Sequence, residues 1–588
     1  MSIVKEVETN IKNHIIKAGY NVDNVILEPT SRKDLGEYQI NTAFSLGKEN
    51  HCNPRLVAEN IVKELETDSN FKNINIAGPG FINISFTDEF YLNSMNKMLE
   101  NIETNIDKSN SKLIFMDYGG ANIAKTLHVG HLRSADIGEA IKRLTTTLGY
   151  KVISDVHFGD IGRQSGMVIY EMHERYPDLV YFKEDYNGED EELPITEKDL
   201  QEIYPCASNK AKENEQIMEK VHEITIQIEN GHKGYTALWN KIKELSIKDI
   251  KSIYKRLNTT FDLYEGETDC YPYIPKVIEI LKDKHLLYES EGAMVVDVKE
   301  ETDTEPMPPL VVLKANGGTV YQTRELATLL SREERFHPDE IWYFTDNRQE
   351  LYFKQVFRVA KKAGIVPETT ELKFFGFGTM NGSDGKPFKT RAGGVMNLTD
   401  LMNMVKEITA SKINTDLVRE EDKDETSEKI SIAALKYADL LPFRSKDFIF
   451  DVSKFADLDG KTGPYLLYST VRIKSLLEKS NEDLSNLKLK VITTETEKEV
   501  MRTLLELPTI LNSSFESKSV NDITDYLYRL TSSYNKFYSE NHILTCNDNA
   551  QKESWLALSK LVRNTNLLLL NILAIEVPEK MSNILHFI

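Results

Sequence analysis

The chain has 588 residues, which is too long for a single core and favours three or four domains. Hydrophobic residues make up 40% of it, enough for packed cores, so a chain that is disordered throughout is excluded. The net charge of −20 argues against a protein that coats nucleic acid with its whole surface. The charge is uneven, however: residues 431–480 hold eight basic and six acidic residues, and such a local face can still attract phosphate.

Apolar runs and cysteines narrow the class further. No apolar run is long enough to span a bilayer, and the first twenty residues lack the apolar core of a secretory signal. We therefore expect a cytoplasmic protein with no membrane partner. The cysteines form no CxxC pair, so we expect neither a disulfide framework nor a structural metal held by thiolates. The four are Cys52, Cys206, Cys270 and Cys546.

The first hundred residues predict a helix, then strands on either side of the glycine–proline turn at residues 77–80, then another helix. This order is typical of a small α+β unit, and the polar run from Asn105 predicts a linker. Farther on, buried strands and helices alternate, which predicts a parallel, doubly wound sheet of the Rossmann type. The strands are expected at residues 112–118, 151–159, 341–346 and 372–380, and the helices between them at 130–148 and 348–364.

Helical patterns fill the rest of the chain. An acidic stretch, with fourteen acidic and four basic residues between positions 184 and 230, interrupts the alternation and predicts a helical insertion at about 184–260. From about Ser427 onward the pattern is almost wholly helical. We therefore expect a small α+β domain at 1–105, a Rossmann-like α/β domain at 106–425 and an all-α domain at 426–588.

The segment DYGGANIAKTLHVGHLRSADIG, which begins at Asp117, runs from the end of a predicted strand through a glycine loop into a helix. In a parallel sheet such a loop lies at the ligand-binding edge, and the helix N-terminus attracts phosphate. His128 and His131 share one helical face, and Gly130 leaves room between them for a flat ring. By itself an HxxH pair is more typical of surface residues or of half a metal site. No HExxH, P-loop or GxGxxG pattern is present.

A second motif, GKPFKTRAGG from Gly385, follows a predicted strand late in the same region. Lys386, Lys389 and Arg391 lie in a glycine-bounded loop that can bring cations onto a phosphate chain. Alone, this is equally typical of an ordinary solvated turn. Together with the histidine segment it forms a known pair of motifs.

The two motifs resemble the HIGH and KMSKS signatures of class I aminoacyl-tRNA synthetases, with HVGH and KPFKT in their places. The longer histidine segment resembles that of the arginyl-tRNA synthetases, which usually have Ser-Pro-Asn where Gly120, Ala121 and Asn122 stand here. The resemblance extends along essentially the whole chain. It includes LGEYQINTAFSLGK, FDLYEGETD, VYQTRELATLL, RQELYFKQVF, TGPYLLYSTVR and VPEKM.

The resemblance implies a two-step reaction in which arginine attacks the α-phosphate of ATP, bound with Mg²⁺, and the arginyl group then passes to tRNA(Arg). In-line displacement at phosphorus needs positioned reactants and donors for the charge that develops. The implied catalytic residues are Lys125, His128, His131, Lys386 and Lys389. The implied ATP-binding residues are His128, Gly130, His131, Lys386, Lys389 and Thr390.

Arginine recognition needs carboxylates for the guanidinium and acceptors for its other N–H groups. The positions that match the family's arginine contacts are Asp117, Asn122, Tyr321, Glu325 and Gln349. His157, in HFGDIGRQSG, resembles the family's strand-to-loop segment, and we assign it to the active-site wall among the arginine-binding residues. The family often has Glu where Asp117 stands and Asp where Glu325 stands, so the charges persist while the reach differs by one methylene. Without the resemblance, Tyr321 fits core packing and Glu325 fits a solvated helix face.

The all-α domain resembles the family's anticodon-binding module, and the N-terminal domain resembles its module for the outer corner of tRNA. The implied tRNA contacts are Asn41 in the N-terminal domain and Tyr465, Tyr468 and Arg472 in the all-α domain. The two tyrosine rings and the guanidinium can stack on unpaired bases. We expect Gly463 and Pro464 to form a turn that holds the two tyrosines at the surface. The alternative is a tyrosine-rich helical core, which we expect for Tyr526, Tyr528 and Phe537.

Three other functions stay open from the residues alone. The first is an adenylyltransferase that acts on a small acid without RNA, and the long helical domain argues against it. The second is a non-catalytic tRNA-binding relative, which the intact histidine and lysine motifs disfavour. The third is a metal-dependent hydrolase. We expect a monomer.

Overall fold

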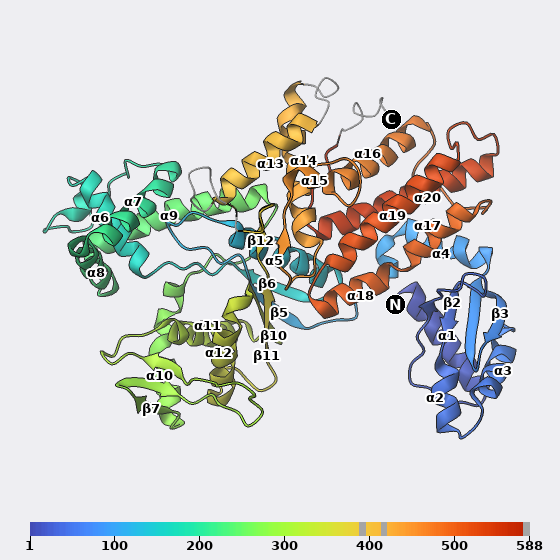
Figure 1. Ribbon diagram of the computed structural model, residues 1–588, viewed down its shortest axis with the longest axis horizontal. Helices are drawn as coiled ribbons and strands as arrows, with labels where there is room; N and C mark the ends of the chain where they lie inside the picture. Colours follow the sequence, from blue (N-terminus) through green and yellow to red (C-terminus); the bar gives the residue numbers. More distant parts are fainter. Residues whose placement is uncertain (387, 389–395, 413–419, 580–588) are drawn as a thin grey trace.

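The computed structural model describes residues 1–386, 388, 396–412 and 420–579. The N-terminal unit is an α+β fold, which confirms the prediction (Figure 1). Its antiparallel sheet has the order β1-β2-β4-β3. Helix α1 begins after Ser2, whose side chain accepts from the Lys5 N–H, and it buries Ile3, Val7 and Ile11. The elements are α1 (Ile3–Lys17), β1 (Glu28–Pro29), β2 (Tyr38–Ile40), α2 (Thr42–Glu49), α3 (Pro54–Leu65), β3 (Phe71–Ala77), β4 (Phe81–Phe86) and α4 (Asp88–Glu100).

The central sheet is parallel, with the order β11-β10-β5-β6, as the strand and helix alternation predicts. Its strands are β5 (Leu113–Asp117), β6 (Lys151–Asp155), β10 (Glu340–Asp346) and β11 (Glu371–Phe377). The order reverses between β5 and β10, so the carboxyl ends of these two strands flank the point where such sheets bind ligands. The helices next to this point are α5 (Val129–Thr147), α11 (Tyr321–Phe336) and α12 (Glu350–Ala363).

The insertion between β6 and β10 is larger than the acidic stretch that predicts it. Its helices are α6 (Arg163–Arg175), α7 (Glu197–Glu213), α8 (Glu215–Glu229) and α9 (Lys233–Arg256). A second lobe follows, in which the antiparallel sheet β7-β8-β9 accompanies α10 (Ile274–Asp283). Its strands are β7 (Leu287–Ser290), β8 (Ala293–Val296) and β9 (Leu310–Leu313). The two lobes lie one above the other on the left of Figure 1.

The C-terminal part is helical, and the helices begin earlier than Ser427. Its elements are α13 (Leu398–Lys412), α14 (Glu420–Leu440), α15 (Val452–Phe455), α16 (Gly463–Lys479), α17 (Glu495–Leu505), α18 (Leu507–Ser517), α19 (Asn521–Glu540) and α20 (Asn549–Ile572). The expected boundary between residues 425 and 426 falls inside α14. Two short strands, β12 (Met380–Asn381) and β13 (Phe448–Ile449), pair in parallel and join this part to the end of β11.

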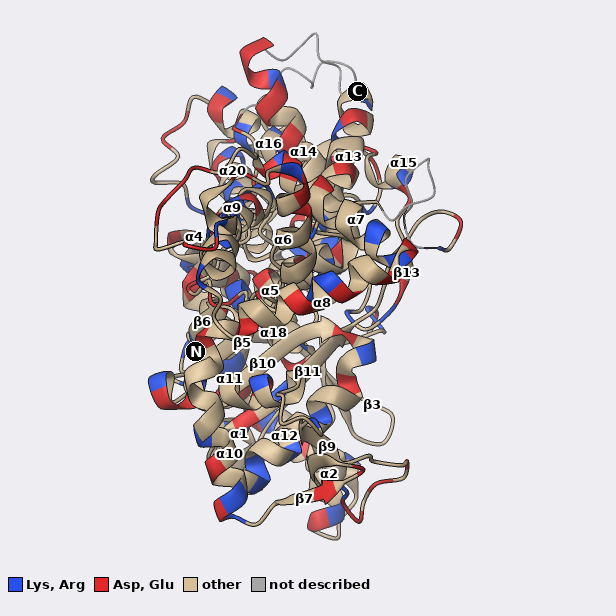
Figure 2. Ribbon diagram, turned by 90° about the vertical axis from the view of Figure 1, so that its left-hand side faces the viewer, with Lys and Arg blue, Asp and Glu red and all other residues tan. Residues whose placement is uncertain are grey.

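The prediction of a turn at Gly463 and Pro464 is wrong, because these residues are the buried first two residues of α16. Proline suits this place, since the first turn of a helix needs no N–H donor there. The predicted core position of Tyr526 and Phe537 on α19 is confirmed, since both are fully buried, whereas Tyr528 is half-buried. In Figure 2, basic and acidic residues are interspersed along the helices rather than separated at opposite ends. Not one helix in the described part of the chain has the length and apolarity that crossing a membrane demands.

Candidate active site

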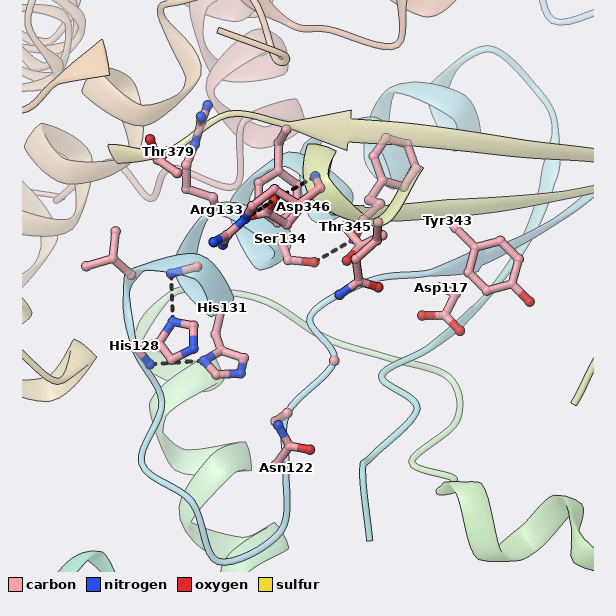
Figure 3. Close-up of a pocket in the computed structure, with 18 of the residues that line it drawn as sticks. Asp117, Asn122, His128, His131, Arg133, Ser134, Tyr343, Thr345, Asp346 and Thr379 are labelled. Atoms are coloured by element: carbon pink, nitrogen blue, oxygen red, sulfur yellow. Dashed lines mark hydrogen bonds and ion pairs between the residues drawn. The ribbon is translucent and has the colours of Figure 1, made fainter. Parts of the chain in front are cut away.

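A cavity of about 590 Å³ opens at the carboxyl ends of β5 and β10, where the strand order reverses. Figure 3 shows the histidines at the start of α5 on one side of it and Asp117 and Tyr343 on the other. Asn122, in the loop that follows β5, lies below the histidines. The predicted site residues that line the cavity are Asp117, Asn122, His128, Gly130, His131, His157, Glu325 and Gln349.

The two histidines are fixed by the backbone that begins α5. His128 is the N-cap residue, and its Nδ1 accepts from the Gly130 N–H at 3.0 Å. The His128 N–H in turn donates to Nδ1 of His131 at 3.0 Å, and the ring centroids lie 4.0 Å apart. A Cβ at Gly130 would lie 2.8 Å from the His128 ring, so glycine is needed for this arrangement.

The protonation of His131 follows from its surroundings. Burial, reinforced by the nearby His128 and Lys125, lowers the pKa of His131 to about 3, so the ring is neutral at physiological pH. Because Nδ1 accepts a backbone hydrogen bond, the proton sits on Nε2, which is thereby a donor. Burial also lowers the pKa of His128. The start of α5 therefore offers neutral imidazole donors and helix N–H groups, which suit phosphate oxygens.

The opposite side of the cavity is a cluster of carboxylates. Asp117 ends β5, and its Oδ2 lies 2.7 Å from Nη2 of Arg332 on α11. Burial raises the pKa of Asp117 to about 6, against the opposing effect of Arg332 and His157. Glu325 accepts from the Tyr343 hydroxyl at 2.7 Å. The alternative of a solvated helix face is therefore wrong for Glu325.

His157 lies behind these carboxylates, with a left-handed backbone (φ 47°) and its Nδ1 3.4 Å from Oδ2 of Asp155. Burial by itself lowers the pKa of His157, but the Asp155 carboxylate and the charge of Asp117 outweigh burial and raise it to about 9. The ring is therefore a cation at neutral pH. Around this side of the cavity stand four carboxylates and three cations: Asp117, Asp155, Glu267 and Glu325 against His157, Arg324 and Arg332. When all seven side chains are ionised, their net charge is −1, so one added positive charge would neutralise this side of the cavity.

Several predicted site residues lie away from the cavity wall. Lys125 points to the Tyr204 ring, 5.1 Å from its centroid. Tyr321 is 60% exposed, which contradicts core packing, and its carbonyl accepts from the Tyr352 hydroxyl. Lys386 lies in a turn in which its N–H donates to Asp384, near the cavity-lining Phe388. Lys389, Thr390 and Arg391 lie outside the described residues.

Sequence reasoning missed three residues that shape the cavity or its wall, namely Arg133, Arg332 and Tyr343. Arg332 donates to Asp117, to Asp155 and to the Tyr343 hydroxyl. Its place seven residues after Glu325 on α11 puts both on one helical face, which is a signal that the sequence does contain. Tyr343 is in the middle of an apolar strand pattern and gives no such signal.

The predicted tRNA contacts are distributed over two surfaces. Asn41 is exposed before α2, and its amide donates to Glu28 at 3.3 Å. Tyr465 is half-buried, and its hydroxyl accepts from Asn535 on α19 at 2.9 Å. Arg472 also bonds Asn535 and stands over the Tyr538 ring, 4.7 Å from its centroid. Tyr468 is half-buried beside Arg472, so α16 and α19 hold these side chains in a shared polar seam.

In the part of the chain that the structure describes, no three His, Cys, Asp or Glu side chains gather as a metal site. His128 and His131 instead bond to the backbone of their own helix. The half metal site that an HxxH pair alone allows thus lacks a third ligand among the described residues.

Comparison with known proteins agrees with the site and extends over the chain. Residues 94–452 match the family described as class I tRNA synthetases (R), catalytic domain. Residues 466–581 match the DALR anticodon binding domain, and residues 5–86 match the arginyl tRNA synthetase N terminal domain. All three matches agree with the resemblance that the motifs indicate.

Relatives of known name are similar to the chain from end to end. The arginine–tRNA ligase of Alkaliphilus oremlandii is 41% identical over 584 residues, which cover 98% of this chain and 100% of the relative. That of Agathobacter rectalis is 40% identical, with the same two coverages. The arginyl-tRNA synthetase of Plasmodium falciparum superposes with a TM-score of 0.79 at 26% identity, covering 98% of this chain and 99% of its own. The arginyl-tRNA synthetase of Thermus thermophilus shares the fold, with a TM-score of 0.76 at 18% identity over 98% of this chain and 100% of its own. The chain therefore belongs to the arginyl-tRNA synthetases, within class I of the aminoacyl-tRNA synthetases.

Proposed function

We propose that the chain ligates L-arginine to tRNA(Arg) at the expense of ATP, through an arginyl-adenylate, with release of diphosphate and AMP. The observation that carries this proposal is the division of one cavity into two chemical halves. One half, at the start of α5, presents imidazole and backbone donors. The other half, at the ends of β5 and β10, presents carboxylates with one negative charge in excess. Arginine fits both halves: its guanidinium can bind the carboxylate half, and its own carboxylate then lies toward the half that would hold the phosphates of ATP.

In the first step the arginine carboxylate attacks the α-phosphate of ATP, and diphosphate leaves. Charge builds on the phosphate oxygens, and the neutral His131, which donates from Nε2, and His128 stand where that charge is stabilised. We assign Lys386, Lys389 and Thr390 to the diphosphate side, as the lysine motif implies. ATP enters as its magnesium complex, so the metal belongs to the substrate.

Arginine is held by the carboxylate half. We assign its guanidinium to Glu325 and Asp117, and its polar backbone groups to the amides of Asn122 and Gln349. The support is that all four line the same cavity, together with the charge balance around His157. Lys125 and Tyr321, which do not line the cavity, keep their implied roles only as predictions.

In the second step the terminal ribose hydroxyl of tRNA attacks the arginyl carbonyl and AMP leaves. We assign anticodon binding to the all-α domain at 426–588, through Tyr465, Tyr468 and Arg472. We assign the outer corner of tRNA to the domain at 1–105, through Asn41, and the chemistry to residues 106–425. We further propose that the enzyme works as a monomer in the cytoplasm.

Charging of mixed tRNA with each amino acid in turn tests the proposal. Only arginine should be attached, and lysine should be rejected by about 10⁴-fold, because a site with carboxylates spaced for a guanidinium leaves polar groups unpaired with an ammonium. Equal charging with lysine would contradict the assignment of Glu325 and Asp117. Arginine-dependent exchange of diphosphate without any transfer to tRNA would favour the adenylyltransferase alternative.

A further inference from the structure

Arg133 is a fully buried arginine that lines the active-site cavity, two residues beyond His131 on α5. Its guanidinium makes four hydrogen bonds inside the protein. Nε donates to Oδ1 of Asp439 at 2.7 Å, and Nη1 donates to the carbonyls of Gly378 at 2.7 Å and Lys446 at 3.3 Å. Nη2 donates to the carbonyl of Asp439 at 3.4 Å. A guanidinium has about five N–H donors, so most of those of Arg133 are used in hydrogen bonds to other parts of the protein. We call this set of hydrogen bonds the Arg133 tie.

The partners of Arg133 belong to three different parts of the chain. Arg133 itself is on the helix that presents the two histidines. Gly378 directly follows β11 and begins the arm that leads to the lysine motif. Asp439 is in the last turn of α14, and Lys446 is in the segment between α14 and β13, on the way to the helices of the C-terminal domain. Figure 3 shows Arg133 between the histidine helix and Thr379 of the arm.

The arm and the segment after α14 are also joined to each other. The N–H of Thr379 donates to Oδ1 of Asp447 at 2.7 Å, and β12 pairs with β13. A Cβ at Gly378 would lie 2.4 Å from the carbonyl of Lys446, so only glycine allows this approach. The segment that leads to the C-terminal helices is therefore bound both to the arm and to Arg133.

A second buried pair, one acidic and one basic side chain, lies next to these contacts of Arg133. Asp136 on α5 and Lys436 on α14 are both fully buried, and Nζ of Lys436 lies 3.8 Å from Oδ1 of Asp136. Two acidic and two basic side chains thus meet between α5 and α14, where apolar residues would pack at lower desolvation cost. Buried polar side chains of this kind can specify one arrangement of two helices rather than add stability.

We propose that Arg133 is a positioning residue. It fixes the position of α5, which carries the histidines, relative to the arm that leads to the lysine motif. That relative position then depends on the segment from Asp439 to Lys446, which connects the arm and Arg133 to the C-terminal helical domain. The inference rests on the proposed function, because the quantity it controls is the rate of arginine activation. A displacement of about 1 Å between reacting groups can cost about 100-fold in rate, even when the change is not at the reacting atoms.

The test is steady-state and single-turnover charging of tRNA with arginine by Arg133→Lys, which keeps the charge and loses the fork of donors. We expect kcat to fall by about 10-fold to 100-fold while KM for arginine and for ATP stays within about threefold, because the binding groups remain in place. Asp439→Asn should reduce kcat in the same direction. The double variant should be no slower than Arg133→Lys alone, because both changes break the same tie.

A matched control is Arg358→Lys on α12, whose guanidinium pairs with both oxygens of Asp303 at 2.7 and 2.8 Å outside the cavity. This variant should charge arginine at the wild-type rate. If the wild-type protein does not charge tRNA with arginine, the proposed function is wrong.

Two results would overturn the role of Arg133 in a wild-type protein that does charge tRNA. One is a kcat of Arg133→Lys within twofold of the wild-type value, and the other is additive losses of kcat in the double variant. Melting curves check folding, and if Arg133→Lys does not fold, an unaltered kcat in Asp439→Asn overturns the proposal instead.

Discussion

Arg332 and Asp117 form an ion pair at the active site, with Nη2 of the buried Arg332 2.7 Å from Oδ2 of the cavity-lining Asp117. The same nitrogen lies 3.1 Å from Oδ2 of Asp155, so one guanidinium serves the ends of two neighbouring strands, β5 and β6. An arginine of the protein thus already occupies part of the carboxylate cluster. Asp117 is therefore shared between the fold and the proposed substrate, whereas Glu325 receives its described hydrogen bond from Tyr343 alone.

Arg332→Gln should lower the free energy of unfolding by about 3–5 kcal/mol, because it leaves Asp117 without its ion-pair partner and leaves Asp155 with His157 alone. Urea denaturation measures the change. The matched control is Arg335→Gln on the same helix, where the partner Glu265 lies 2.8 Å away at the surface. That loss should stay within about 1 kcal/mol. Equal effects of the two changes would show that the buried pair does not carry the stability we assign to it.

Because of Asp117, kcat/KM for arginine should fall on the acid side of its pH profile, which gives the profile an acid limb. Its pKa is raised to about 6 by burial, and only the carboxylate form attracts a guanidinium. As pH falls through about 6 the group gains a proton, so kcat/KM for arginine should decrease there with a slope of one proton. The limb belongs to the free enzyme, and saturating arginine should move it to lower pH. Asp117→Asn should have low kcat/KM throughout and no limb near pH 6, and a limb that persists in this variant would assign it to another group.

Glu325→Gln tests the guanidinium contact. Glutamine keeps the shape and can still accept from the Tyr343 hydroxyl, but it removes the charge. A hydrogen bond to a charged group contributes about 1.5–3 kcal/mol, so KM for arginine should rise by about 10-fold to 100-fold while KM for ATP is unaltered. Glu333→Gln, on the same helix near His337, is the control and should leave both constants unaltered. An unaltered KM for arginine in Glu325→Gln would place the guanidinium elsewhere.

Tyr465 and Tyr468 should contribute to tRNA binding through their rings. Each change to alanine should weaken binding of tRNA by about tenfold to a hundredfold, since stacking on a base contributes about 1–3 kcal/mol. The half-buried position of Tyr465 adds a second effect that a phenylalanine can isolate. Tyr465→Phe keeps the ring and loses the hydrogen bond from Asn535, so tRNA affinity should persist while stability falls by about 1 kcal/mol. Alanine variants with a large loss of melting temperature and unaltered tRNA affinity would reject the anticodon role.

The sequence by itself determined the features that depend on neighbours along the chain. The period of apolar residues set the strands and helices of the α/β region, because burial of one face needs that period. The position of His128 and His131 at the start of α5 was also readable, since a helix start and an i, i+3 spacing are local properties, and here each ring bonds to the backbone of that same turn. The signature motifs then identified the family.

Tertiary structure alone decided which distant residues complete the site. Arg332 is 215 residues from Asp117 in sequence, and they meet because α11 packs beside the strand junction of a parallel sheet. No local pattern encodes which strands pair, since that choice depends on the burial of the whole sheet. The glycine at position 463 shows the same limit. Next to proline it predicts a turn, but it begins α16 after the N-cap residue Thr462. A Cβ there would lie 2.1 Å from the carbonyl oxygen of Ala433, so the small size of glycine serves the close packing of α16 on α14.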